Sequence, residues 1–322
     1  MSNETFNANT RLLTPSIEAV NLTKRFGTLT AVENLSLRIE GPKCVGFLGP
    51  NGSGKTTTLK MFTGLMRASS GQAKINGVDV QARKTEALQS VGTLIEVPEI
   101  YPNLTPREVL TMLAKIRGIP GPDRAHVIEE AVAEVQMGDW IDKKIGKFSK
   151  GMKQRICIAS ALLGGPAVIL LDEPTQGLDP RGMNEVRGII KSLKGQGRLI
   201  FMSSHLLGEV TDVCDEVAMI NHGKLLDYDT LSNLIAKFSR GENAVEATFR
   251  RTVKDEQFAD FPNVASVEKI ADRIVRIHFT GGLDAQESLL AGIVGMDVGL
   301  IDYKLAWSEL EDVYLNLIKD AK

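Results

Sequence analysis

The chain has 322 residues, with 38 Lys and Arg against 40 Asp and Glu and a formal net charge of −2. This length suits one large domain and a smaller one. The nearly balanced charge lacks the excess of basic residues typical of nucleic-acid-binding proteins, so we expect no nucleic-acid partner. Apolar stretches such as residues 167–171 are far shorter than the roughly 18 residues of a membrane span, so we expect any membrane role to come through a partner.

The first segment is polar and leads into a region of alternating hydrophobicity. Residues 1 to about 15 lack the basic segment and apolar core of a signal peptide, and we expect a disordered tail. From Ile17 to Ile39 the alternation around a turn at Gly27 predicts antiparallel strands.

The stretch GPNGSGKTT, Gly49 to Thr57, lies between two predicted elements. It follows the apolar residues 44–48, which predict a buried strand, and it precedes residues 58–62, which predict the first turns of a helix. The phosphate-binding pattern G-x-x-x-x-G-K-[ST] requires this context. A chance match in a chain of this length has a probability on the order of one per cent. We therefore favour a phosphate-binding loop over an ordinary glycine-rich turn.

The residue types of this loop predict ATP binding. Its glycines allow backbone conformations closed to other residues, so that successive N–H groups point at the β-phosphate. Lys55 would lie along the β- and γ-phosphates, and the Thr56 hydroxyl would ligate Mg²⁺. Phe26 is either a core aromatic or a ring that offers its face to adenine. The predicted nucleotide-binding residues of the loop are Gly49, Asn51, Gly52, Ser53, Gly54, Lys55, Thr56 and Thr57.

The next segment holds a strand end and two helices. Residues 91–95 predict a strand that stops at Glu96, a carboxylate at a strand end. Residues 105–108 form a capping box with proline at the first helical position, so we expect a helix over 106–117 and a second over 123–137. These helices carry no catalytic residue types and are better candidates for partner contact than for chemistry.

Another helix start carries Ser149 and Gly151. Ser149 suits the N-cap of a helix from Met152 to about Leu163. Taken alone, an ordinary capped helix is the better interpretation. The Ser149 hydroxyl and the Gly151 amide nevertheless form a second anion site, and a chain with one phosphate loop has no second phosphate for it. Two anion sites but one phosphate loop in the chain indicate that the second site binds the nucleotide of another copy.

Two acids follow a buried strand. Residues 167–171 are consecutive apolar residues that predict a parallel strand, and Asp172 and Glu173 emerge at its C-terminal edge, where open α/β sheets bind ligands. Such acids can be mere turn formers. Behind this strand, we expect Asp172 to hold Mg²⁺ and Glu173 to orient and activate the attacking water. Asp179 caps the next helix, with proline at the first helical position.

A further strand over residues 199–202 ends in Ser203-Ser204-His205. A lone histidine after a strand is more often structural than catalytic. In this sheet its imidazole would reach the same crevice and hydrogen-bond the γ-phosphate, and we favour that interpretation for His205. The cysteines Cys44, Cys157 and Cys214 are widely separated in apolar surroundings, which predicts reduced core residues without a metal site.

The last third of the chain carries no motif. Residues 226–241 predict a linking helix, and residues 244–303 follow the order strand, helix, strand, strand, helix, strand. This order predicts a small ferredoxin-like α+β module, followed by an amphipathic helix over 307–318. Dimerisation, regulation and a simple spacer are the open alternatives for its role.

Over residues 17 to about 228, the chain resembles the ATP-binding subunit of an ABC transporter. Five ordered motifs carry the resemblance: GPNGSGKTT, FSKGMKQR, LLDEP, GLDP and SSH. The resemblance implies that Phe26 stacks on adenine and that Ser149 and Gly151 close over the γ-phosphate bound to a second subunit. It also implies that Asp179 communicates across that dimer and that His205 is the switch histidine. Two copies would then enclose two ATP molecules head to tail.

Two positions depart from the family pattern. Glu96 stands where the family usually has Gln, a residue that contacts Mg²⁺ and water; Glu can also ligate Mg²⁺ but adds a negative charge. The signature reads FSKGM where LSGGQ is commonest, which places Lys150 beside the phosphate. Both variants resemble the ATPases of ABC-2 type exporters, especially those for bacitracin-like and lantibiotic peptides.

These inferences combine into one expected organisation. We expect a tail over 1–15, a P-loop ATPase domain of α/β class over 16–228 with a helical subdomain at about 97–163, and a linker and accessory domain over 229–322. The implied partners are a transmembrane permease and a second ATPase subunit, at the cytoplasmic face of the membrane. The alternative is a soluble ATPase of the same type that clamps nucleic acid or ribosomes. The predicted catalytic residues are Lys55, Glu173 and His205, and the predicted Mg²⁺ ligands are Thr56, Glu96 and Asp172.

Overall fold

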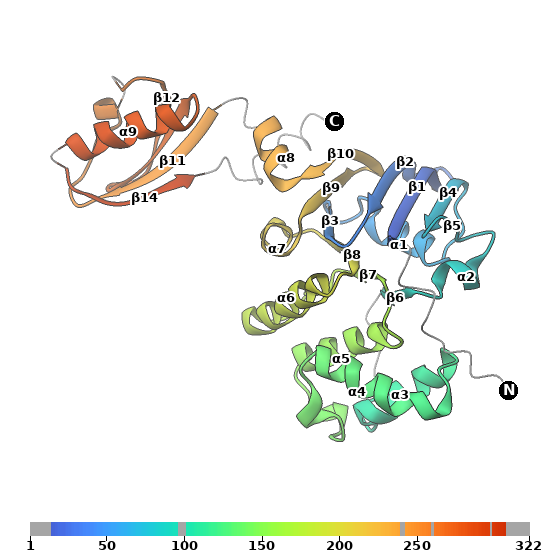
Figure 1. Cartoon of the computed structure of the whole chain (residues 1–322). Coiled ribbons are helices and arrows are strands. Elements are labelled where there is room, and N and C mark those ends of the chain that lie inside the picture. The colour runs from blue at the N-terminus through green and yellow to red at the C-terminus, as the bar shows by residue number, and fades with distance from the viewer. Residues whose placement is uncertain (1–13, 96–100, 239–241, 259–260, 297, 307–322) are drawn as a thin grey trace. The chain divides into compact units, whose positions relative to one another are not determined.

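A computed structural model of the chain describes residues 14–95, 101–238, 242–258, 261–296 and 298–306 (Figure 1). The chain separates into two compact units, Met1–Asp229 and Thr230–Lys322. Three sequence predictions concern residues outside the described ranges, namely the tail up to residue 13, Glu96, and the helix over 307–318.

A six-stranded sheet forms the centre of the first unit. Its strands are β3 Cys44–Leu48, β6 Val91–Leu94, β7 Val168–Asp172, β8 Leu199–Ser204, β9 Glu216–Asn221 and β10 Lys224–Thr230. They lie in the order β10-β9-β3-β8-β7-β6. The pairs β3 with β8, β3 with β9, β7 with β8 and β6 with β7 are all parallel.

The three strands at the middle of this sheet end at the same level. β3, β7 and β8 are buried along their whole length, as parallel strands covered on both faces are. The register sets Leu48 opposite Ser204 and Asp172 opposite Ser203. The loops that follow these strands therefore leave from one edge of the sheet.

A second, antiparallel sheet shares its core with the first. It is built from β1 Ser16–Phe26, β2 Leu29–Glu40, β4 Ser70–Ile75 and β5 Val78–Asp79, in the order β2-β1-β4-β5. The antiparallel strands predicted around Gly27 are confirmed, and Gly27 turns the chain with a φ of 57°. One apolar cluster joins the two sheets and includes Ile17, Phe47 and Phe201, with the two phenylalanine rings 5.2 Å apart.

Helices complete the first unit. They are α1 Lys55–Phe62, α2 Lys84–Leu88, α3 Pro106–Ile116, α4 Arg124–Glu134, α5 Lys150–Leu162, α6 Pro180–Gly195 and α7 Leu207–Val213. α3, α4 and α5 pack on one another as a helical group (Figure 1). The predicted capping box is confirmed, because the Thr105 side chain accepts from the Glu108 N–H and the Glu108 side chain accepts from the Thr105 N–H.

Several predicted helix ends were wrong by two or three residues. α1 begins at Lys55 rather than residue 58, because the last residues of the phosphate loop form its first turn. α5 begins at Lys150 rather than Met152, because a cap at Ser149 makes the next residue the first helical one. α4 ends at Glu134. The next turns run through Gln136, whose φ of 57° is incompatible with a continuing helix.

The second unit is an α+β module. It contains α8 Leu231–Phe238, β11 Glu242–Phe249, β12 Val264–Ala271, β13 Ile274–Thr280, α9 Leu283–Gly295 and β14 Leu300–Ala306, with the antiparallel sheet order β12-β13-β11-β14. In the described residues, the first of the two helices predicted between its strands is only a 3₁₀ turn, Asp255–Phe258. This short turn inserts Phe258 into the apolar core. The α+β class is confirmed, whereas the ferredoxin-like label stays a prediction.

The structure brings two of the three free, buried cysteines together. The Sγ atoms of Cys44 and Cys214 lie 3.6 Å apart. The hydrogen bond with Cys44, together with burial, raises the pKa of the Cys214 thiol. Burial alone raises the pKa of Cys157 to about 11. Because the thiolate is the nucleophile, these raised pKa values predict unreactive thiols at neutral pH.

We therefore expect Cys157 and Cys214 to resist alkylation while the chain is folded. At pH 8 with iodoacetamide, mass spectrometry should find these two thiols unmodified under conditions that fully alkylate N-acetylcysteine in the same tube. In urea all three cysteines should react, because unfolding exposes them. Rapid modification of Cys157 in the folded chain would contradict the account of its burial.

Candidate functional site

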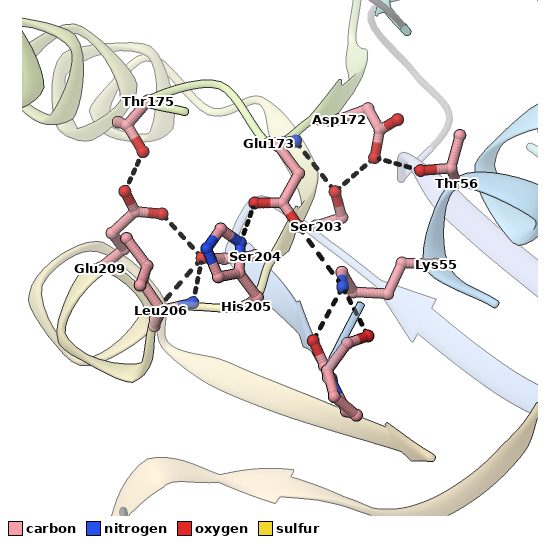
Figure 2. A network of polar contacts seen from close by, with 12 residues as sticks. Lys55, Thr56, Asp172, Glu173, Thr175, Ser203, Ser204, His205, Leu206 and Glu209 are labelled. Atoms are coloured by element: carbon pink, nitrogen blue, oxygen red, sulfur yellow. Dashed lines mark hydrogen bonds and ion pairs between the residues drawn. The ribbon is translucent and has the colours of Figure 1, made fainter. Parts of the chain in front are cut away.

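The residues predicted to carry chemistry gather at the sheet edge where β3, β7 and β8 end (Figure 2). Lys55 begins α1 after the loop that follows β3. Asp172 is the last residue of β7 and Glu173 follows it, while His205 follows the last residue of β8. Four side chains from three separate segments thus face one region.

The loop before α1 has a shape that only glycine permits at two of its positions. Gly54 has a φ of 105°, and a Cβ built there would lie 2.5 Å from the Ala31 carbonyl oxygen. A Cβ at Gly49 would lie 2.4 Å from the carbonyl oxygen of Ile220. Without these side chains the backbone turns tightly enough to present the N-terminus of α1, which has no side-chain cap. The free N–H groups of a first helical turn bind anions.

Lys55 directly follows this loop as the first residue of α1 and is only 6% exposed. Its Nζ donates to the carbonyl oxygens of Gly49 at 2.8 Å and Pro50 at 3.1 Å, and it lies 3.4 Å from Oε1 of Glu173. The nearby Ser53 hydroxyl is buried and has no hydrogen-bond partner in the described part of the chain. A buried hydroxyl and an ammonium group beside a helix N-terminus fit a phosphate, whose oxygens accept from all three.

The predicted metal ligands Thr56 and Asp172 lie next to each other. Thr56 Oγ1 donates to Asp172 Oδ1 at 3.2 Å, and Ser203 Oγ donates to the same oxygen at 2.6 Å. Within the described ranges, no three His, Cys, Asp or Glu side chains form a metal-binding group. One carboxylate and one hydroxyl suit Mg²⁺, which keeps several waters and takes its remaining ligands from substrate phosphates.

Glu173 connects the loop lysine to His205. Its Oε2 lies 2.6 Å from His205 Nδ1, while its Oε1 faces Lys55. Its backbone has a φ of 47°, a left-handed conformation that costs free energy for a residue with a side chain. Such strain is often found at functional positions.

Ser203 was missed as a site residue. Besides donating to Asp172, its hydroxyl accepts the N–H of Glu173 at 2.9 Å, so it fixes both acids at the end of β7. A serine in SSH carries no signal of this by itself. The contact follows from the parallel register that sets Ser203 opposite Asp172.

The residues of the predicted second anion site, Ser149 and Gly151, lie at the N-terminus of α5, and Asp179 lies at the N-terminus of α6. Ser149 caps α5 by accepting the Met152 N–H at 3.2 Å, and Asp179 caps α6 by accepting the Gly182 N–H at 3.1 Å. The two helix starts touch, because a Cβ at Gly151 would lie 3.4 Å from the Cα of Gly182. Among the described residues no hydrogen bond or ion pair joins Ser149 or Asp179 to the phosphate loop.

Lys150 lies against the loop that precedes α6 in its own chain. A Cβ built at Gly177, where φ is 67°, would lie 2.2 Å from Lys150 Nζ. The lysine that distinguishes this signature therefore occupies the space that a side chain at Gly177 would need.

Other predicted residues are Phe26, two residues of the phosphate loop, and Glu96. Phe26 is 46% exposed at the end of β1, so the core interpretation was wrong, and Lys24 Nζ lies 5.0 Å from its ring centroid. In the phosphate loop, Asn51 is exposed and Thr57 is half-buried. Glu96 lies outside the described residues.

The comparisons with known proteins agree on one family. The sequence profile described as "ABC transporter" matches residues 32–176. The chain is 39% identical over 308 residues to the bacitracin transport ATP-binding protein BcrA of Bacillus licheniformis, covering 94% of this chain and 97% of that protein. It is 36% identical over 222 residues to the lantibiotic transport ATP-binding protein SrtF of Streptococcus pyogenes, covering 68% of this chain and 94% of that protein.

Solved structures show the same fold. An ATP-binding subunit of an ABC transporter superposes with a TM-score of 0.61 at 26% identity, covering 69% of this chain and 93% of that one. A dimeric bacterial ABC transporter cassette gives a TM-score of 0.59 at 23% identity, covering 67% of this chain and 98% of that one. In the part of the chain that the structure describes, no helix combines the length and hydrophobicity needed to cross a membrane.

Replacing Gly54 by alanine tests the shape of the phosphate loop. Gly54→Ala adds both a strained φ and a close contact with the Ala31 carbonyl, whereas Gly27→Ala adds only a strained φ in open space. We expect Gly27→Ala to lower the free energy of unfolding by about 1 kcal/mol, and Gly54→Ala by about 3 kcal/mol because overpacking adds to the strain. Urea unfolding of both variants measures the difference, and equal values would show that the contact is relieved at no cost.

Proposed function

The chain belongs to the ATP-binding proteins of ABC transporters and is an ATPase of that family, and we propose that it powers export by a separate transmembrane permease. The observation that carries the proposal is the convergence of Lys55, Asp172, Glu173 and His205 at one sheet edge, beside a helix N-terminus without a cap. This set of groups can bind a triphosphate, hold a cation and orient a water. The nucleic-acid clamp finds no support in the chain's charge or in its relatives.

ATP binding rearranges the contacts of Lys55 in this proposal. The phosphates accept hydrogen bonds from the loop N–H groups, and the γ-phosphate takes the Lys55 ammonium from Glu173. Thr56 and Asp172 would hold Mg²⁺, and we assign Glu96 to the same ion, whose charge would offset that of the phosphates. The exposed Phe26 ring stacks on adenine.

Hydrolysis then uses the freed carboxylate of Glu173. Glu173 orients a water and accepts its proton as the water oxygen attacks the γ-phosphorus and the bond to the β–γ bridging oxygen breaks. His205, now without Glu173 as its partner, hydrogen-bonds the γ-phosphate. The products are ADP and phosphate.

A second copy of the chain completes each site. We propose that Ser149 and Gly151 of one subunit close over the γ-phosphate bound to the other, and that Asp179 contacts the same interface. The absence of a hydrogen bond or ion pair from Ser149 to its own phosphate loop among the described residues supports this arrangement. Closing and opening of the homodimer would drive the permease between conformations.

The proposed class of transported substrate and the proposed cellular location of the chain are taken from the names of its relatives. The names of BcrA and SrtF support a bacitracin-like or lantibiotic peptide as cargo, with the chain held at the cytoplasmic face of the membrane by the permease. We assign residues 16–228 to the ATPase domain and 229–322 to an accessory domain. The strand order β12-β13-β11-β14 of the accessory domain supports the ferredoxin-like description.

Glu173→Gln tests the catalytic assignment. The amide keeps the shape of the side chain but cannot accept a proton, so ATP hydrolysis should fall about 100-fold or more while ATP binding is retained. With ATP present, the variant should elute as a stable dimer in size-exclusion chromatography. Glu130→Gln, an exposed change on α4, is the control and should hydrolyse ATP normally. Hydrolysis by Glu173→Gln at the parent rate would remove Glu173 from the mechanism.

Glu96→Gln tests the departure from the family pattern. Because glutamine is neutral, we expect ATP hydrolysis to continue with a changed dependence on Mg²⁺ concentration or on pH. Hydrolysis rates across a Mg²⁺ series at several pH values measure this. If both profiles match those of the parent chain, the charge at this position has no role in the metal site.

A further inference from the structure

Two buried polar side chains, one on the signature helix and one on the helix after His205, reach one short segment. Gln154 of α5 is 5% exposed and Glu209 of α7 is 1% exposed. Burying an amide or a carboxyl group costs free energy unless it is hydrogen-bonded. Both groups use their polar atoms on Pro174 and Thr175, the two residues that follow Glu173.

Gln154 holds this segment from the side of the signature helix. Its Nε2 donates to the carbonyl oxygen of Pro174 at 2.6 Å, and the bond is buried. The proline has no N–H to offer, so this carbonyl is its one backbone hydrogen-bonding group. The bond therefore ties α5 directly to the residue after Glu173.

Glu209 holds the next residue of the segment, Thr175 (Figure 2). One of its oxygens accepts from Thr175 Oγ1, and the other accepts from Ser204 Oγ at 2.7 Å. Thr175 and Ser204 are themselves buried. The Ser204 hydroxyl also accepts the Leu206 N–H at 2.9 Å, which closes the turn around His205.

The segment between these contacts starts at a strained residue. Glu173 has a φ of 47°, and such a conformation persists only where the surrounding structure holds it. Ser203 fixes its N–H on one side. On the other side, Gln154 and Glu209 fix the next two residues.

We propose that Gln154 and Glu209 are positioning residues for ATP hydrolysis. Together they clamp Pro174–Thr175, and this clamp fixes the positions of Glu173 and His205 relative to each other. The proposal rests on the function assigned above to Glu173. It predicts that loosening the clamp lowers kcat and leaves the affinity for ATP unchanged, because no clamp contact involves a residue of the phosphate loop.

Thr175 offers the least disruptive test. Thr175→Val keeps the shape of the side chain and removes the hydroxyl, whereas Thr175→Ser keeps the hydroxyl. In the full chain, we expect kcat to fall about tenfold in Thr175→Val, with KM for ATP within about twofold of the parent, since misplacing a catalytic group slows the chemical step. Thr175→Ser should keep most of the parent kcat.

Changes at the two clamp residues extend the test. Glu209→Gln and Gln154→Leu should each lower kcat about tenfold or more by the same reasoning. The matched control is Asp212→Asn, the same carboxylate-to-amide change on α7, where Asp212 pairs with Lys191 at the surface; it should keep the parent kcat. Thr175→Val should cost less in the Glu209→Gln background than in the parent chain, because the amide keeps only one acceptor oxygen for the two hydroxyls that Glu209 binds.

The outcomes separate the clamp from the function it rests on. If Glu173→Gln abolishes hydrolysis while Thr175→Val and Thr175→Ser have the same kcat, the clamp is wrong and the role of Glu173 stands. If Glu173→Gln itself hydrolyses ATP at the parent rate, the proposed function fails first. A rise in KM with unchanged kcat would also overturn the clamp. If Glu209→Gln does not fold, as judged by circular dichroism, the two Thr175 variants decide the question.

Discussion

The site depends on one constraint, the parallel pairing of β8 with both β3 and β7. Because the register sets Leu48 opposite Ser204 and Asp172 opposite Ser203, the strands stop together. Each is too buried to place polar side chains along its length, so polar groups begin only where the strands end. The chemistry is confined to one edge because the rest of the sheet is apolar.

At that edge, the polar groups of the site form hydrogen bonds and ion pairs mainly with one another. Glu173 faces Lys55 with one oxygen and His205 with the other, and Ser203 joins Asp172 to the Glu173 backbone. Groups this buried require partners, and in a low-dielectric setting their contacts are strong and directional. The groups that would bind phosphate and those that would activate water are therefore linked before any reaction occurs.

Sequence reasoning succeeded where a function is carried by consecutive residues. The phosphate loop, the capping box at Thr105 and the cap at Ser149 are local patterns, and the structure has the elements they predict. Contacts set by pairing between distant segments could not be predicted this way: Ser203 with Asp172, Glu209 with Thr175, and Cys44 with Cys214. The helix expected before β12 failed for a related reason, because Phe258 packs into a core that only the folded sheet creates.

The close approach of Gly151 to Gly182 packs the starts of α5 and α6 directly against each other. A Cβ built at Gly151 would lie in van der Waals contact with the Cα of Gly182, at 3.4 Å, so the two backbones approach more closely than side chains larger than a methyl group would allow. Ser149 and Asp179 cap these two packed helix starts. In the proposed dimer, both capping groups would therefore approach the second subunit's nucleotide from one pair of packed helix starts, and a side chain larger than a methyl group at either glycine would press on the other helix.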